Sequence, residues 1–124
     1  MSNYRVKTTS VKTASLNAQS TTASVPCDRD AVIEECWISS RDGITAHAAN
    51  NSTLVILNGA TKLFERKFIT APAETIAALT NEKLTALADT SVSKSTCLQI
   101  RYDYNGSGLA QDLDIVFVFR PSRS

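Results

Sequence analysis

Two runs near the C-terminus, residues 97–104 and 112–120, have a large apolar side chain at every second position. This pattern restricts what the chain can fold into. Successive side chains of a β-strand point to opposite faces, so each run has one wholly apolar face. These faces consist of Leu98, Ile100, Tyr102 and Tyr104 in the first run and of Leu113, Ile115, Phe117 and Phe119 in the second. A helix would spread the same residues around its circumference. Because residues 105–111 contain two glycines, which favour a chain reversal, we expect an antiparallel hairpin whose apolar face lies on a core.

Three further segments have the composition of strands. Residues 31–38 are rich in apolar side chains, and the pair of glutamates within them favours a β-bulge or an edge position. Residues 53–57 are apolar and lead into Asn58-Gly59, the strongest short signal for a hairpin, with a return strand over residues 62–69. Short strands separated by turns, without alternating helices, predict an all-β fold, an antiparallel β-sandwich or jelly roll.

The passage from residue 70 to residue 95 is less regular. Pro72 suits the first turn of a helix, and we expect a short helix near residues 73–79 followed by a strand over residues 82–86. The alternative is one continuous helix over residues 73–88, because several apolar residues there fall near helical spacing.

The N-terminal segment contrasts with the rest of the chain. Residues 1–25 are rich in Ser and Thr, contain no acidic residue and have few apolar side chains to bury. We therefore expect an extended arm over residues 1–25, with at most one strand near 4–7 or 21–25, and a β-sandwich domain over residues 26–124. The candidate partner-binding residues of the arm are Tyr4, Arg5, Lys7 and Lys12. On this division, a chain without residues 2–24 should still fold.

Composition excludes several classes of function. The 124 residues suit one domain, and a net charge of +1 provides no strong field for nucleic acid or an anionic membrane. No apolar run is long enough to span a membrane, and residues 1–7 lack the apolar segment of a secretory signal. We therefore expect synthesis in the cytoplasm, with no nucleic-acid and no membrane partner. Three cysteines and one histidine predict neither a disulfide framework nor a zinc site.

The sequence contains no recognisable catalytic motif, so we expect no enzyme, no cofactor and no metal. Asp103, Asp112 and Asp114 could supply oxygen ligands for calcium, but they are more typical of a solvated strand face. Trp37 could pack in the core or serve as a stacking platform for a ligand. His47 lies among alanines without a catalytic partner, which is typical of a structural residue.

Several features together carry a resemblance to a known group of proteins. They are the hairpin Thr53-Leu54-Val55-Ile56-Leu57-Asn58-Gly59, the Thr- and Ala-rich passage 70–95, Leu98-Gln99-Ile100-Arg101-Tyr102, the loop Asn105-Gly106-Ser107-Gly108, and Asp114-Ile115-Val116-Phe117-Val118-Phe119 before Pro121. In these features the chain resembles the small β-sandwich proteins of tailed-bacteriophage virions, namely capsid decoration (cement) proteins and head-fibre modules. Residues 68–79 also share part of their pattern with bacterial Ig-like repeats.

The resemblance implies a non-enzymatic virion structural protein that is made in the host cytoplasm and binds the outer surface of a capsid. The implied partners are the major capsid protein and further copies of the chain, as a trimer or dimer. The alternative is an Ig-like or carbohydrate-binding adhesion module, for which Trp37 would be a contact residue. A small cytoplasmic regulator that acts by occlusion is a third hypothesis.

Overall fold

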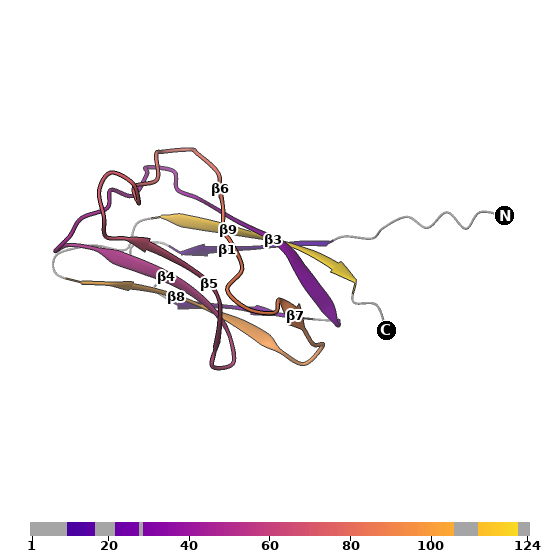
Figure 1. Cartoon of the computed structure of the whole chain (residues 1–124). Coiled ribbons are helices and arrows are strands. Elements are labelled where there is room, and N and C mark those ends of the chain that lie inside the picture. The colour runs from indigo at the N-terminus through magenta and orange to yellow at the C-terminus, as the bar shows by residue number, and fades with distance from the viewer. Residues whose placement is uncertain (1–9, 17–21, 28, 106–111, 122–124) are drawn as a thin grey trace.

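The computed structural model of the chain describes residues 10–16, 22–27, 29–105 and 112–121 (Figure 1). Within these ranges the regular structure consists of β-strands, and no helix is present that is long and apolar enough to cross a membrane. The strands are β1 (Ser10–Leu16), β2 (Thr22–Pro26), β3 (Ala31–Ser39), β4 (Ser52–Asn58), β5 (Thr61–Phe68), β6 (Glu82–Lys83), β7 (Ser91–Val92), β8 (Cys97–Tyr104) and β9 (Leu113–Pro121).

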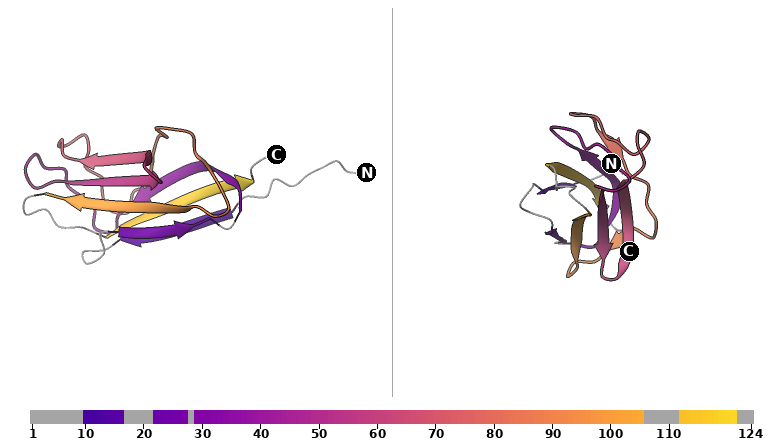
Figure 2. Two further views of the ribbon diagram at one scale, coloured as in Figure 1. Left: turned by 90° about the horizontal axis from the view of Figure 1, so that it is seen from below. Right: turned by 90° about the vertical axis from the view of Figure 1, so that its left-hand side faces the viewer.

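The strands form two antiparallel sheets. Sheet 1 has the order β1-β9-β3-β6, with β7 also paired to β3, and sheet 2 has the order β2-β8-β4-β5. Figure 2 shows that the strands of both sheets run along the long axis of the molecule. The all-β sandwich expected from the alternating runs is therefore confirmed.

The pairing is nested from the ends of the chain towards its middle. The first strand pairs with the last, β2 pairs with β8, and β4 pairs with β5 through the Asn58-Gly59 turn. Between the β2–β8 pair and the β4–β5 pair in this nesting, β3 pairs with both β6 and β7. These two short strands together occupy the position of one strand. This succession, distributed over two sheets, is the strand order of a jelly roll. Of the two architectures left open by the sequence, the jelly roll is the more specific description.

The core lies between the sheets and is formed by the apolar faces that alternation defines. The side chains of Leu98, Ile100 and Tyr102 from β8 are fully buried, as are those of Ile115 and Phe117 from β9. The Tyr102 ring lies edge-on to Phe68, with 6.4 Å between centroids, and the Tyr102 hydroxyl accepts a hydrogen bond from Ser52 Oγ at 3.1 Å. The apolar faces are thus confirmed, except at Tyr104, which is exposed.

The hairpin expected between the two C-terminal runs is wrong. Strand β8 belongs to sheet 2 and β9 to sheet 1, so the two strands face each other across the core and share no ladder. Their ladders are made with distant segments, since β8 pairs with β2 and β4 while β9 pairs with β1 and β3. Alternation reports which face of a strand is buried, and it says nothing about the strand's neighbours.

The expected arm is also wrong for its described part. Residues 10–16 pair along their full length with β9, and residues 22–25 belong to β2, in agreement with the strand expected near 21–25. Leu16 and Val25 belong to the buried core. These segments gain stability from ladders with apolar strands, which compensates for their Ser- and Thr-rich composition. A boundary between residues 25 and 26 would therefore divide one folded body. Residues 1–9 lie outside the described residues.

No helix forms over residues 73–79 or 73–88. The chain turns over residues 71–74, and Ile76 makes an isolated bridge with Ile44. Gly43 permits this approach, because a Cβ there would lie 3.0 Å from the Ala78 nitrogen and its φ of +78° suits glycine. The strand expected over residues 82–86 is limited to β6. A helix would place Leu79 and Leu87 on the same face as Ile76, but both leucines are exposed here, so their spacing does not report a common buried face.

Strand β3 lies inside sheet 1 and contains the expected bulge. Its register with β9 shifts between Ile33 and Glu35. Thr90 compensates for the irregularity, because its carbonyl accepts a hydrogen bond from the Ile33 amide at 3.0 Å and its hydroxyl donates to the Ile33 carbonyl at 2.9 Å. The edge position that the glutamate pair also allowed is wrong.

The sandwich has two distinct ends. At the terminal end, β1 begins at Ser10 opposite Phe119 and β9 closes at Pro121 opposite Ala31. At the loop end, residues 40–51 follow β3 and residues 69–81 follow β5 (Figure 1). Ser10, the first described residue, therefore lies at the end opposite to these two connections.

Candidate functional site

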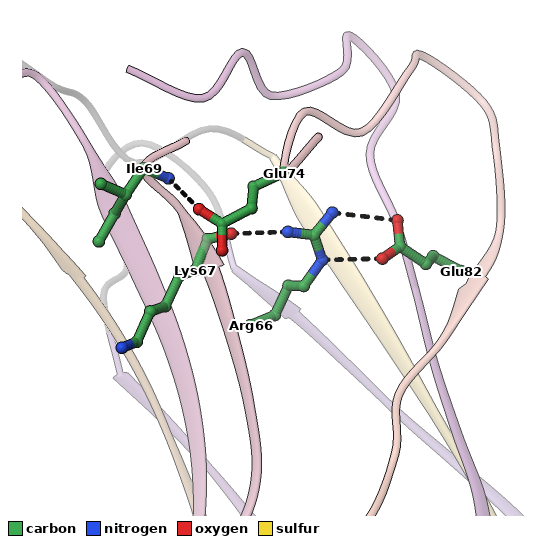
Figure 3. A network of polar contacts seen from close by, with 5 residues as sticks. All are labelled: Arg66, Lys67, Ile69, Glu74 and Glu82. Atoms are coloured by element: carbon green, nitrogen blue, oxygen red, sulfur yellow. Dashed lines mark hydrogen bonds and ion pairs between the residues drawn. The ribbon is translucent and has the colours of Figure 1, made fainter. Parts of the chain in front are cut away.

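One long side of the sandwich is closed by a polar network between β5 and β6 (Figure 3). Arg66 Nε donates to Glu82 Oε1 at 2.8 Å, and a second guanidinium nitrogen donates to Glu82 Oε2 at 3.2 Å. The third nitrogen donates to the Lys67 carbonyl at 2.6 Å, and the guanidinium carbon lies 4.8 Å from the centre of the Phe68 ring. This two-pronged pair links the edges of the two sheets. The Arg66 side chain is 11% exposed and the Glu82 side chain is 39% exposed, so the pair is only partly shielded from solvent.

Glu74 stabilises the adjoining turn. Its Oε1 accepts hydrogen bonds from the amides of Thr70 at 2.6 Å and Ile69 at 3.1 Å. The Thr70 amide bond is the largest cause that holds the pKa of Glu74 below its usual value, and the nearby Arg66 charge acts in the same direction. These contacts explain the local backbone of residues 69–74. Their role is to stabilise this turn, and they bring no reactive groups together.

The outer face of sheet 1 is apolar at its centre. We call it the valine–tryptophan face; its residues are Val11, Val32, Trp37, Val116 and Val118. In the ladders Val11 lies opposite Val118, and Val116 lies opposite Trp37. Val11 is 60% exposed and the other four side chains are half-buried. This face was not predicted from the sequence, although the two valines that alternate with Phe117 and Phe119 indicated that both faces of β9 carry apolar residues.

Trp37 belongs to this outer face and not to the core. Its Nε1 donates to Glu35 Oε1 at 2.8 Å, and the ring is partly accessible. Of the two alternatives left open by the sequence, core packing is therefore wrong. The arrangement places an aromatic ring and a carboxylate side by side on a sheet surface, which is the kind of pair that can stack on and hydrogen-bond to a polar ring.

The outer face of sheet 2 is polar by contrast. Thr22, Ser24, Gln99, Arg101 and Asp103 are all exposed on β2 and β8. An ion pair joins Arg101 to Asp103 at 3.7 Å, and both side chains are more than half exposed, so this contact contributes little stability. The two outer faces therefore differ in the chemistry that they can offer to a partner.

The structure does not gather the candidate arm residues into one described site. Tyr4, Arg5 and Lys7 lie outside the described residues, so their role stays a prediction. Lys12 lies in β1 opposite Phe117 and is half-buried, which places it in the folded body.

The other candidate residues have local structural roles. Asp103 pairs with Arg101, and Asp114 accepts a hydrogen bond from Ser15 Oγ at 2.7 Å. His47 Nδ1 accepts hydrogen bonds from the amides of residues 49 and 50 at 3.0 and 2.8 Å, which stabilises its own turn. Within the described ranges, no three His, Cys, Asp or Glu side chains come together in a way that could hold a metal ion.

The three cysteines differ in their surroundings. Cys97 is exposed, whereas Cys27 and Cys36 are buried. Burial raises the pKa of the Cys36 thiol to about 12, so at neutral pH Cys36 is a small apolar core residue.

Comparison with known proteins identifies no relative: no family model, curated protein or solved structure matches the chain.

Proposed function

We propose that this protein is a virion structural component that binds the outer surface of a tailed-phage capsid as a decoration or head-fibre protein. The jelly roll supports this proposal by analogy, because the architecture is common in viral capsid proteins, although it also occurs in lectins and other folds. On this proposal the major capsid protein is the partner, and the protein acts by adhesion without a chemical step.

The observation that carries the proposal is the separation of the two ends. The chain enters the sandwich at Ser10, opposite Phe119, while the connections 40–51 and 69–81 lie at the far end. A segment before Ser10 that binds a coat subunit would leave the sandwich projecting outwards. Residues 1–9 include Tyr4, Arg5 and Lys7, which could pair with acidic and apolar groups of a capsid. Many copies on a symmetric shell would make modest contacts collectively strong.

The deletion that tests this proposal must be shorter than residues 2–24, because that range contains β1 and the first part of β2. Removing residues 2–24 would delete β1 and most of β2, so that truncated chain should not fold, contrary to the expectation from sequence. Deleting residues 2–9 leaves every described strand in place. We expect this variant to melt like the full chain and to lose co-sedimentation with purified tailed-phage heads assembled without their decoration protein.

A matched pair of charge variants sharpens the test. Arg5→Ala with Lys7→Ala should weaken co-sedimentation, whereas Lys67→Ala with Lys94→Ala, which removes two exposed lysines of the body, should not. Full occupancy by the residue 2–9 deletion, or equal binding by both double variants, would show that the N-terminal segment does not attach the protein.

Trp37 and Glu35 favour a second candidate, carbohydrate binding by the valine–tryptophan face. Trp37 is the only tryptophan of the chain, so its fluorescence reports directly on a sugar that stacks there. On this hypothesis an oligosaccharide panel shifts the emission, and calorimetry shows that Trp37→Ala loses binding while Tyr104→Ala, at an exposed aromatic residue on β8, keeps it. Unchanged emission across the panel would exclude this candidate.

A further inference from the structure

The four edges of the two sheets are protected to very different degrees. In the part of the chain that the structure describes, sheet 1 ends in β1 on one side and in β6 and β7 on the other, while sheet 2 ends in β2 and β5. An edge strand offers backbone amides and carbonyls to any other strand, and proteins usually block this with charges, proline, bulges, short strands or covering loops.

Three of these edges carry such protection. Strand β5 contains Lys62, Glu65, Arg66 and Lys67, its ladder with β4 has a register shift, and the Leu63 carbonyl already accepts a hydrogen bond from the amide of residue 87. Strands β6 and β7 have two residues each. Strand β2 has five residues and ends in a proline.

Strand β1 is the exception. It has seven residues, contains no proline and keeps an unbroken register with β9 from Ser10 to Leu16. Its outward side chains, Val11, Thr13 and Ser15, are exposed and uncharged. Its one charged residue, Lys12, lies on the opposite, inward face and is half-buried.

We propose that β1 pairs in antiparallel fashion with β1 of a second copy of this chain, about a two-fold axis that passes through Thr13. Centring the pair on Thr13 engages all seven residues of each strand, because Ser10 then lies opposite Leu16 of the other copy. The two threonines face each other, a favourable cross-strand pair, and Lys12 faces Ala14, so no like charges are directly opposed.

A second copy fits this edge for a reason of symmetry. An isologous contact uses the same strand from both partners and closes at two copies, which leaves no further β1 edge exposed. The paired sheets would also place the two Val11 side chains on one continuous outer surface. The pairing is independent of the capsid proposal, since a dimer in solution needs no virion.

The test is the association state of the full chain and of three variants by analytical ultracentrifugation. The unmodified chain should sediment as a concentration-dependent dimer. Thr13→Lys and Thr13→Glu each place like charges opposite one another, and each should raise the dimer dissociation constant about 10-fold, which corresponds to about 1.4 kcal/mol. Ser24→Lys, an equivalent change at an exposed site on edge strand β2, should leave association unchanged.

A mixture of the two charged variants distinguishes the loss of the β1–β1 contact from misfolding of the variants. An equimolar mixture of the Thr13→Lys and Thr13→Glu variants places opposite charges across the axis, so it should dimerise at least as strongly as the unmodified chain. Each variant alone should retain the unmodified far-ultraviolet spectrum, because residue 13 is exposed. A monomer at all concentrations, a trimer, loss of association in Ser24→Lys, or a mixture that fails to dimerise would each overturn the proposal.

Discussion

The two long sides of the sandwich are closed in different ways. On one side, the Arg66–Glu82 pair joins β5 to β6, and the amides of Leu84 and Leu87 donate at 2.8 Å to carbonyls of Cys36 and Leu63. On the other side, β1 and β2 lie against each other at the ends of their sheets, joined through residues 17–21, which lie outside the described ranges. The first side contains charged groups and polar cross-links, and the second consists mainly of small hydroxyl side chains.

The fold therefore covers the sheet edges on one side with its own chain, and in the described ranges it places no charged outward side chain and no covering segment on the β1 edge of the other side. The segment 82–92 covers the β5 side and satisfies the backbone of the β3 bulge. On the other side, β1 keeps a regular, uncharged outward row. The covered side should therefore contribute stability, and the β1 side should contribute contacts with a partner.

The largest effect is expected at the core that both sides share. Ile115→Lys should abolish cooperative folding, because it places an unpaired charge where the side chain is fully buried. Val116→Lys, one residue along on the outer face, should still fold. Thermal melting followed by circular dichroism tests both variants, and an unchanged melt for Ile115→Lys would show that the face assignment is wrong.

The second-largest expected effect is a loss of folding stability at the β5–β6 side alone. Arg66→Met keeps much of the side-chain volume but removes the bonds to Glu82 and to the Lys67 carbonyl. We expect a loss of about 1–3 kcal/mol in the free energy of unfolding by urea titration. Hydrogen bonds to charged groups contribute about 1.5–3 kcal/mol, and the lower end is reduced because the Glu82 side chain is 39% exposed. Ser24→Lys on the opposite side should change it by less than about 0.5 kcal/mol. Equal losses would remove the contrast between the sides.

Thiol labelling gives a smaller but more direct comparison. In the folded chain Cys97 should react at once, since it is exposed, while the buried Cys27 and Cys36 wait for local opening. Cys27 follows β2, whereas Cys36 lies in the middle of β3, so Cys27 should react before Cys36 if the β1–β2 side opens first. Mass spectrometry of quenched samples gives the order, and faster labelling of Cys36 would contradict it.

The smallest effect is a pH dependence at the covered side. The folded-state pKa of Glu74 is lowered from 4.5, chiefly by the Thr70 amide, so its contribution is fully present above that unfolded value and is lost as the pH falls through the folded value. Glu74→Gln should therefore flatten the stability profile below pH 4.5. Asp89→Asn should act similarly, because the Ser91 amide lowers the pKa of Asp89. Profiles parallel to that of the unmodified chain would exclude these contributions.

Local patterns predicted a large part of this fold. The Asn58-Gly59 turn, the strand expected over residues 31–38, its bulge and the buried faces of β8 and β9 were all predicted from residues close together in the chain. The strand β1 was not readable, because its stability comes from a ladder with β9, about one hundred residues away in sequence. The valine–tryptophan face was missed for the same reason, since three distant strands contribute to it.

By itself, the sequence determined that the chain forms strands and which side of most strands is buried, because alternation in a strand has a period of two residues. Only the tertiary structure decided that β8 and β9 oppose each other across the core and that residues 10–16 belong to the body. Strand partners depend on contacts between distant segments, and no local periodicity records them. The edges, which carry the proposed contacts, exist only once that pairing is complete.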